Sequence, residues 1–110
     1  MKPSFDKEGF LTDLDSWTPD LAIQLAKQEH IALTPEHWEI IDLLRDFYQQ
    51  YELSPAMRPL VKAVKQQLGP EKGNSIYLMK LFCQSRDLQN NSPAKIVSKI
   101  AGLPKPTNCL

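Results

Sequence analysis

The chain has few of the residues that build covalent or metal-held scaffolds. Among its 110 residues are two cysteines, Cys83 and Cys109, and two histidines. Two cysteines are too few for the disulfide framework of a small secreted domain, and no Cys/His spacing resembles that of a zinc site. We therefore expect neither a structural metal nor a disulfide scaffold.

Long apolar runs are missing as well. No run approaches the ~20 apolar residues that a membrane-spanning helix needs, which excludes a helical membrane protein. The first residues, MKPSFDKEGF, carry acids early and lack an uninterrupted apolar core, so they do not resemble a secretory signal. The sequence thus indicates a cytoplasmic protein. Its mass of 12.6 kDa fits one domain.

The formal net charge of zero conceals a difference between the two halves of the chain. Residues 1–55 hold 4 Lys/Arg and 11 Asp/Glu, a balance of −7. Residues 56–110 hold 9 Lys/Arg and 2 Asp/Glu, a balance of +7. This separation predicts a strongly dipolar molecule.

Proline is abundant, and its positions indicate helix starts. Four of the nine prolines directly follow a hydroxyl residue, in the pairs Thr18-Pro19, Thr34-Pro35, Ser54-Pro55 and Ser92-Pro93. A Ser or Thr N-cap before a proline at the first helical position is a typical start, because that position needs no backbone N–H. Each pair precedes a stretch with apolar residues at helical spacing.

The spacing of apolar residues predicts five helices. They cover about residues 18–30, 35–51, 54–68, 74–82 and 93–101. The helix at 35–51 has the clearest apolar stripe and is predicted to be the central helix of the fold. Pro59 predicts a bend or a late start in the third helix, and Gly102 is expected to cap the fifth.

Two segments outside the helices complete the predicted fold. Residues 4–14 contain the turn Lys7-Glu8-Gly9 between short apolar segments, which is consistent with a small β-hairpin. Near the other end, Pro104 and Pro106 prevent helix formation and favour extended backbone. We predict a mostly α (α+β) fold, with a body of residues 1–102 and a C-terminal arm of residues 103–110.

Cys109, the penultimate residue, is the strongest candidate for chemistry. One interpretation is an exposed thiol in a frayed tail. The other is a carrier thiol or nucleophile that enters a partner's active site, which the prolines favour because they reduce the entropy lost when the arm is ordered. The adjacent α-carboxylate disfavours the thiolate, so Cys109 suits a carrier better than a self-sufficient enzyme.

Other conspicuous residues have simpler structural interpretations. His37 lies on the apolar stripe of its helix and is expected to be packed and hydrogen-bonded. Cys83 follows an apolar helix and is interpreted as a small, partly buried hydrophobe. Trp17 and Trp38 flank helix starts and are assigned to the core or to the packing at those starts.

A group of cations near the arm is a candidate docking surface. Arg58, Lys62 and Lys65 recur at helical spacing. Together with Lys95, Lys99 and Lys105 they are expected to surround the root of the arm, where they could dock an acidic partner or nucleic acid. A dispersed, solubilising set of charges is the alternative.

Several motifs resemble those of the TusE/DsrC family of small sulfur-carrier proteins, and the resemblance covers nearly the whole chain. The family fold is a small β-hairpin or meander packed on about five helices. The motifs are Glu36-His37-Trp38-Glu39, Arg45-Asp46-Phe47-Tyr48, Ser54-Pro55-Ala56, Leu60-Val61-Lys62-Ala63, Glu71-Lys72-Gly73-Asn74-Ser75 and the terminal Ile100-Ala101-Gly102-Leu103-Pro104-Lys105-Pro106-Thr107-Asn108-Cys109-Leu110.

The resemblance implies that Cys109 carries the sulfur. The DsrC branch has a second redox cysteine eleven positions upstream, where this chain has Ser98, so the chain resembles the TusE branch. Members of that branch pass sulfur from the TusBCD complex to the tRNA thiouridylase MnmA, for thiolation of wobble uridine. The implied function is a sulfurtransferase that works through a cysteine persulfide, without a cofactor.

Two alternatives remain open at the level of the sequence. One is a regulatory module that binds protein or nucleic acid without transferring sulfur. The other is a dithiol redox switch, which Ser98 disfavours and which would need Cys83 within about 7 Å of Cys109, Cα to Cα. The family reads Leu-Phe-Pro where this chain has Leu81-Phe82-Cys83, followed by a longer polar loop to Asn91.

Overall fold

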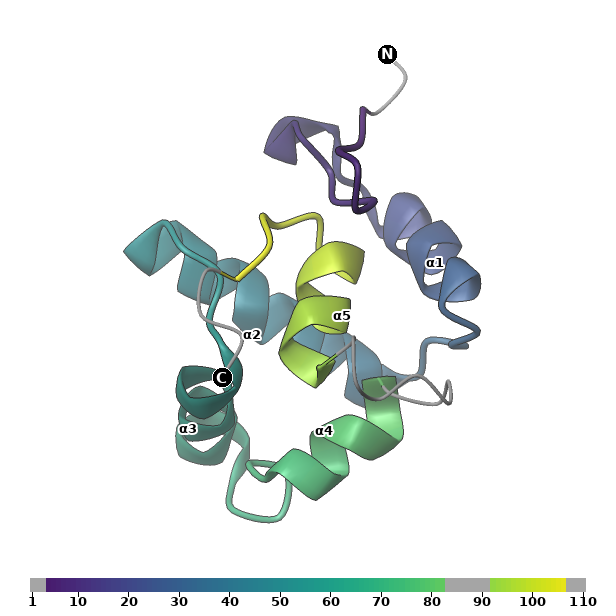
Figure 1. Cartoon of the computed structure of the whole chain (residues 1–110). Coiled ribbons are helices and arrows are strands. Elements are labelled where there is room, and N and C mark those ends of the chain that lie inside the picture. The colour runs from purple at the N-terminus through teal and green to yellow at the C-terminus, as the bar shows by residue number, and fades with distance from the viewer. Residues whose placement is uncertain (1–3, 83–91, 107–110) are drawn as a thin grey trace.

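The described part of the chain consists of short helices joined by loops (Figure 1). The computed structural model describes residues 4–82 and 92–106. In order, its elements are the 3-10 turn η1 (Leu14–Ser16) and the α-helices α1 (Pro19–Gln28), α2 (Pro35–Tyr51), α3 (Met57–Leu68), α4 (Ser75–Phe82) and α5 (Pro93–Ile100). The prediction of a mostly helical fold with five helices is confirmed.

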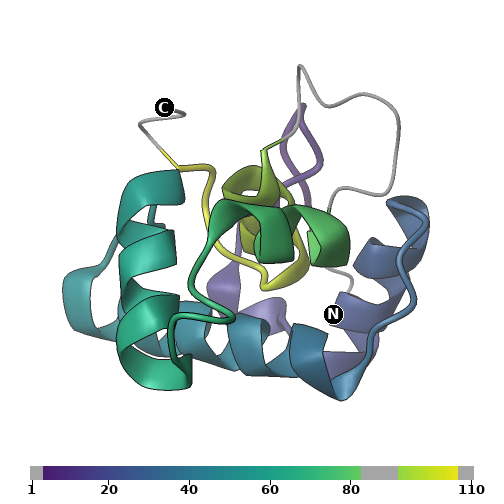
Figure 2. The ribbon, with the colours of Figure 1, turned by 90° about the horizontal axis from the view of Figure 1, so that it is seen from below.

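Helix α5 lies at the centre of the fold (Figures 1 and 2). It packs against α1, α2, α3 and α4, and six of its eight residues are buried. The prediction that the helix at 35–51 would be central is therefore wrong. Helix α2 is longer but keeps a polar face in water, whereas small residues such as Ala94, Val97 and Ser98 let other elements approach α5 closely.

Three of the four hydroxyl-proline pairs start helices as predicted. The Thr18 hydroxyl accepts the N–H of Leu21 at 3.1 Å, and the Ser92 hydroxyl accepts the N–H of Lys95 at 3.2 Å. Thr34 caps α2, and its own N–H donates to Nδ1 of His37 at 3.0 Å. These contacts lie within one helical turn, which explains why the local sequence predicts them.

The fourth pair does not start a helix. Ser54 and Pro55 precede α3, which begins at Met57 after the N-cap Ala56. Pro59 is then the third residue of the helix, where a missing N–H costs no hydrogen bond. Of the two predicted effects of Pro59, a bend or a late start, the structure shows the late start. The Ser54 hydroxyl is used elsewhere, since it donates to the carbonyl oxygen of Pro104 at 2.5 Å.

The expected N-terminal hairpin is a single turn in the structure. No strand is assigned within residues 4–82 or 92–106, and one isolated antiparallel bridge joins Phe5 to Leu11. The turn between them is closed by a hydrogen bond, in which the N–H of Asp6 donates to the carbonyl of Phe10 at 2.8 Å. Phe10 and Leu11 are buried, so packing on the helices holds this turn rather than a β-ladder.

The described helices are short relative to a lipid bilayer, and none is long and apolar enough to cross one. Within the same residues, no group of three His, Cys, Asp or Glu side chains is placed to hold a metal ion.

Candidate functional site

The candidate thiol lies beyond the described part of the arm. Cys109 belongs to residues 107–110, and Cys83 and the predicted loop to Asn91 belong to residues 83–91, all of which lie outside the described residues. The described root of the arm, residues 103–106, can nevertheless be built from its contacts.

Gly102 turns the chain at the end of α5, as predicted. Its φ of +73° is in the left-handed region, which favours glycine. The N–H of Gly102 donates to the Lys99 carbonyl at 3.1 Å, and the N–H of Leu103 donates to the Ser98 carbonyl at 2.9 Å. A Cβ atom at position 102 would lie 2.4 Å from Cδ1 of Trp17, so only glycine fits this turn.

Two side chains from distant parts of the chain bind the carbonyls of the two residues before Gly102. Nε1 of Trp17 donates to the carbonyl of Ile100 at 2.9 Å, and Nη1 of Arg45 donates to that of Ala101 at 2.5 Å. The guanidinium carbon of Arg45 also lies 3.9 Å from the centroid of the Trp17 ring, a cation-π contact. Burial lowers the pKa of Arg45, partly offset by the charge of Asp42. The end of α5 is thus tied to η1 and α2.

The root of the arm is held on the body as well. Ser54, just before α3, donates to the Pro104 carbonyl, and Leu103 is 2% exposed and part of the hydrophobic core. Pro106 is also buried. The described part of the arm is therefore held against the body as far as Pro106.

Arg45 and Ser54 were not identified as site residues from the sequence. Arg45 is the only Lys or Arg in α2, and a single cation on a helix does not indicate a particular partner. Its partner Ala101 is 56 residues away along the chain, and the partner of Ser54 is 50 residues away. Only the tertiary fold brings these groups together.

The three lysines of α5 and the arm are paired with acids. Nζ of Lys105 lies 2.9 Å from Oε1 of Glu8, and Nζ of Lys95 lies 3.8 Å from the same oxygen. Lys99 pairs with Glu29 at 3.3 Å. The hydrogen bond from Lys105 is the largest cause of a lowered pKa at Glu8. These contacts join the N-terminal turn to α5 and to the arm.

The three cations of α3 have different surroundings. Arg58, Lys62 and Lys65 are exposed, and no ion pair joins them to an acid within the described residues. They line an open groove of about 450 Å³, here called the α3 groove, together with Met57, Val61 and Ser75. The six predicted cations thus form two groups, of which only the lysines of α5 and the arm are paired with acids within the described residues.

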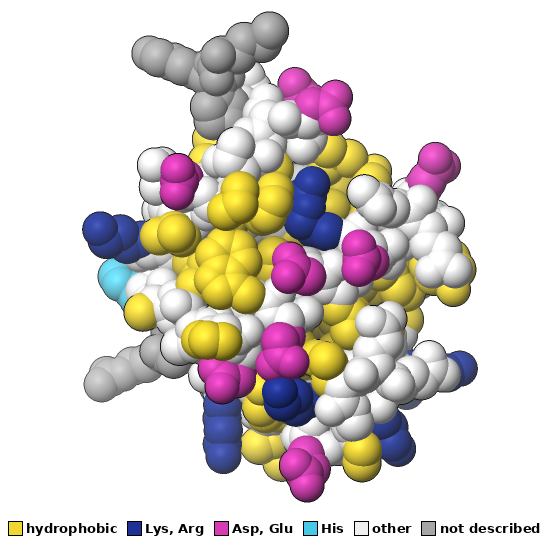
Figure 3. Space-filling view, turned by 180° about the vertical axis from the view of Figure 1, so that it is seen from behind, with side chains coloured by type: hydrophobic (Ala, Val, Ile, Leu, Met, Phe, Trp, Pro, Cys, Tyr) yellow, Lys and Arg dark blue, Asp and Glu magenta, His cyan; other side chains and the backbone are white. Residues whose placement is uncertain are grey.

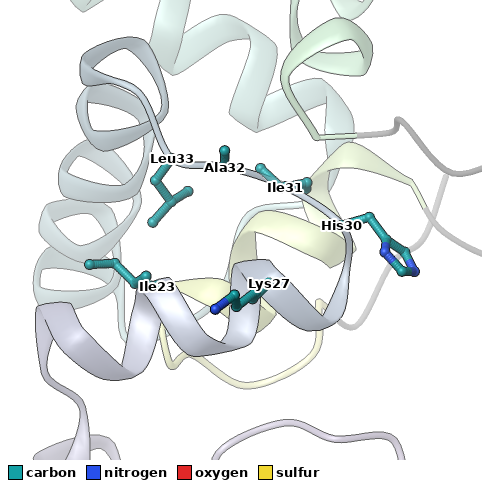
Figure 4. A pocket seen from close by; sticks show the side chains of 6 residues that line it. All are labelled: Ile23, Lys27, His30, Ile31, Ala32 and Leu33. Carbon is teal, nitrogen blue, oxygen red and sulfur yellow. The ribbon is translucent and has the colours of Figure 1, made fainter.

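A larger cavity than the α3 groove lies between α1 and the segment that follows it (Figure 4). It has a volume of about 540 Å³ and is lined mainly by apolar side chains, among them Ile23, Ile31 and Leu33. Lys27 and His30 are its polar residues, and the His30 ring points away from the cavity (Figure 4). Its lining contains no thiol or hydroxyl side chain.

His37 is a buried, fully hydrogen-bonded residue, as predicted. Because Nδ1 accepts the N–H of Thr34, the proton of the neutral ring is on Nε2, which donates to the Leu81 carbonyl at 2.7 Å. The ring packs edge-on against Phe82, with 5.1 Å between centroids. Both nitrogens are occupied, which leaves none for catalysis.

The second position of interest from the family pattern, Ser98, is also structural. It is 0% exposed, in the last turn of α5, and its hydroxyl has no hydrogen-bond partner among the described residues. The face of the molecule seen from behind has acidic side chains beside apolar surface (Figure 3).

The whole chain, residues 1–110, matches the family model described as DsrC like protein. The chain belongs to the DsrC-like family. Two curated relatives are the sulfurtransferases TusE of Pectobacterium atrosepticum, 51% identical, and of Escherichia coli strain K12, 48% identical. Each alignment spans 105 residues, which is 96% of this chain and 90% of the relative.

Solved structures agree with this family membership. The NMR structure of Allochromatium vinosum DsrC is 47% identical, with a TM-score of 0.83 over 98% of this chain and 90% of that one. The oxidized gamma-subunit of dissimilatory sulfite reductase (DsrC) from Archaeoglobus fulgidus is 42% identical, with a TM-score of 0.80 over 100% and 94%. This DsrC-like chain therefore has a sulfurtransferase role in a sulfur relay.

Proposed function

We propose that Cys109 accepts sulfur from a TusBCD-type donor complex and passes it to a tRNA thiouridylase of the MnmA type. The sulfur would then be used for 2-thiolation of wobble uridine in the cytoplasm, without a cofactor or metal. The observation that carries this proposal is the whole-length similarity to sulfurtransferases named TusE, in a chain with Cys109 on an arm beyond a fixed root.

The proposed reaction consists of two sulfur exchanges. The Cys109 thiol loses its proton to solvent, and its thiolate attacks the outer sulfur of the donor's cysteine persulfide. A new S–S bond forms at Cys109 while the donor cysteine leaves as a thiolate. An acceptor thiolate then attacks the outer sulfur on Cys109 and releases the Cys109 thiolate. No external oxidant or reductant is consumed.

The geometry of the root restricts where these exchanges take place. Cys109 is three residues beyond Pro106, so its Cα lies at most about 11 Å from that of Pro106. A donor cysteine must therefore come close to the body at the root of the arm. We propose that the predicted cations, Arg58, Lys62, Lys65, Lys95, Lys99 and Lys105, include the docking residues.

The direct test is persulfide loading followed by mass spectrometry. Incubation with the persulfidated donor is expected to add about 32 Da, one sulfur atom, at Cys109 of the wild-type protein. Cys109→Ser should abolish loading and, in cells, thiolated wobble uridine. Cys83→Ser is the matched control and should load normally.

The main rival is a regulatory module that binds protein or nucleic acid without transferring sulfur. Normal uridine thiolation in a strain with Cys109→Ser would favour this rival. A dithiol switch would instead produce a disulfide between Cys83 and Cys109, with a mass loss of about 2 Da on oxidation. Neither outcome is expected.

A further inference from the structure

We propose that the α3 groove is the surface that docks the sulfur donor, and that it receives an acidic segment of that donor carrying an apolar side chain. This inference rests on the proposed function and goes beyond it, because it divides the six cations into two groups. Arg58, Lys62 and Lys65 would recruit the donor. The lysines of α5 and the arm would hold the body together instead.

The first argument is the difference in pairing. Lys95, Lys99 and Lys105 have carboxylates of Glu8 and Glu29 within 4 Å. The three α3 cations have no such partner among the described residues and are exposed along one helix. Their field therefore extends into solvent with less local cancellation, and it can attract a partner of negative charge.

The second argument is the apolar floor between these cations. Met57 and Val61 line the groove. Ser75, the first residue of α4, lines it as well, so the groove extends to the start of that helix. On α4 itself, the next exposed apolar residues are Ile76 and Met79, with 67% and 37% of their surface in solvent. Apolar surface with a charged rim is typical of protein-docking sites.

The third argument is the position of the groove beside the arm. The Ser54 hydroxyl holds the carbonyl of Pro104, and Ser54 is three positions before Met57, the first residue of α3. The root of the arm therefore runs past the start of the helix that carries the groove (Figure 2). Because Cys109 is at most about 11 Å from Pro106, the donor cysteine has to come near the root, and a donor seated on α3 would lie beside that root.

The chemistry of the groove favours a protein segment over nucleic acid. A phosphate backbone would pair with the cations but would leave Met57 and Val61 uncovered. Carboxylates on either side of an apolar side chain satisfy both the rim and the floor. The occupant is therefore inferred to be an acidic, partly apolar segment of the donor protein.

The test compares two charge reversals of equal size. Lys62→Glu changes the α3 groove, and Lys27→Glu changes an exposed lysine of α1 that lines a different cavity. Sulfur uptake from the persulfidated TusBCD-type donor is measured below saturation and at saturation. Lys62→Glu is expected to slow uptake at least about fivefold below saturation, with an unchanged plateau rate, because docking charges act mainly on association. Lys27→Glu should match the wild type.

Two further measurements complete the design. Lys62→Arg keeps the positive charge and should take up sulfur at the wild-type rate. Added salt should slow uptake by the wild type more than uptake by Lys62→Glu. Glutathione persulfide, a small donor that needs no docking, should load all variants equally. If the persulfidated protein donor fails to load Cys109 of the wild type, the proposed function is wrong. If it loads the wild type normally and Lys62→Glu takes sulfur from it at the wild-type rate, the docking inference is overturned. Weakened tRNA binding with unchanged donor uptake would also overturn it.

Discussion

The junction between α5 and the arm differs from the face of α3 in how its polar groups are used. At the junction, three backbone carbonyls accept hydrogen bonds from Trp17, Arg45 and Ser54. The nearby lysines lie against Glu8 and Glu29. On α3, the cations have no acidic partner within the described residues. In the sequence the two regions look alike, because each contributes three of the six predicted cations.

The comparison teaches that a count of charges does not identify a docking surface. A lysine that already has a carboxylate within hydrogen-bond distance contributes to the fold and has less attraction left for a partner. An unpaired lysine contributes little to stability and remains available. Substitutions should therefore affect stability at the junction and recruitment on α3, and each prediction below tests that division.

The largest effect on stability is expected for Gly102→Ala. The new Cβ would lie 2.4 Å from Cδ1 of Trp17, in a backbone conformation that disfavours side chains. We expect the free energy of unfolding to fall by about 3 kcal/mol. Gly69→Ala is the control, since φ is also positive there but no atom lies within 4 Å of its Cβ. Urea denaturation gives the free energy of unfolding of both variants. Gly69→Ala reports backbone strain alone, and Gly102→Ala reports strain together with the clash. Equal losses of stability would show that Trp17 moves aside.

Arg45→Met should cost less, by about 1–2 kcal/mol. The variant removes the hydrogen bond to Ala101 and the cation-π contact with Trp17 while keeping an apolar stem. Arg58→Met on α3 makes the same chemical change without a described partner and should stay within about 0.5 kcal/mol of the wild type. Thermal or urea unfolding measures both. Similar losses in the two variants would break the comparison between the regions.

Neutralising single lysines should give a smaller difference of the same sign. Lys99 and Glu29 form a partly buried pair, with side chains 17% and 19% exposed. Lys99→Gln is expected to lower the free energy of unfolding by about 1 kcal/mol, and Lys62→Gln by less than about 0.5 kcal/mol. Chemical denaturation at low and high salt checks this, because the loss in Lys99→Gln should shrink as salt screens the wild-type pair.

The smallest expected effect is a change in the titration of Glu8. The hydrogen bond from Lys105 lowers its pKa in the folded protein, so the stabilisation is present above the unfolded pKa and is lost as the pH falls through the folded value. Lys105→Gln should move the Glu8 pKa back up toward its ordinary value. An NMR titration of the carboxyl carbon measures this, with Lys62→Gln as the control that leaves Glu8 unchanged.

Several features of the fold could be predicted because their causes are local. Thr18 and Ser92 cap helices through N–H groups three residues away, and Gly102 ends α5 in a conformation that glycine favours. His37 reaches back to Thr34 within one turn. For such residues the sequence neighbours are also the spatial neighbours, so pattern and propensity suffice.

Other features could not be predicted because their partners are far away along the chain. Ser54 has the local signature of an N-cap, yet its hydroxyl binds Pro104 and α3 begins later at Met57. Residues 4–14 have the pattern of a hairpin, yet they form a single bridge, and the turn is held by burial of Phe10 and Leu11 rather than by a ladder of β-sheet hydrogen bonds. In both cases tertiary packing overrides the local preference.

The sequence by itself determined the five helices, their main caps, the position of Cys109 three residues after Pro106 and the resemblance to sulfur carriers. Tertiary structure alone decided that α5 is central, that Trp17, Arg45 and Ser54 hold the root of the arm, and which of the six predicted cations have acidic partners. The physical reason is that helix formation depends on contacts within a turn, whereas the pairing of a charge depends on which distant carboxylate the fold brings within about 4 Å.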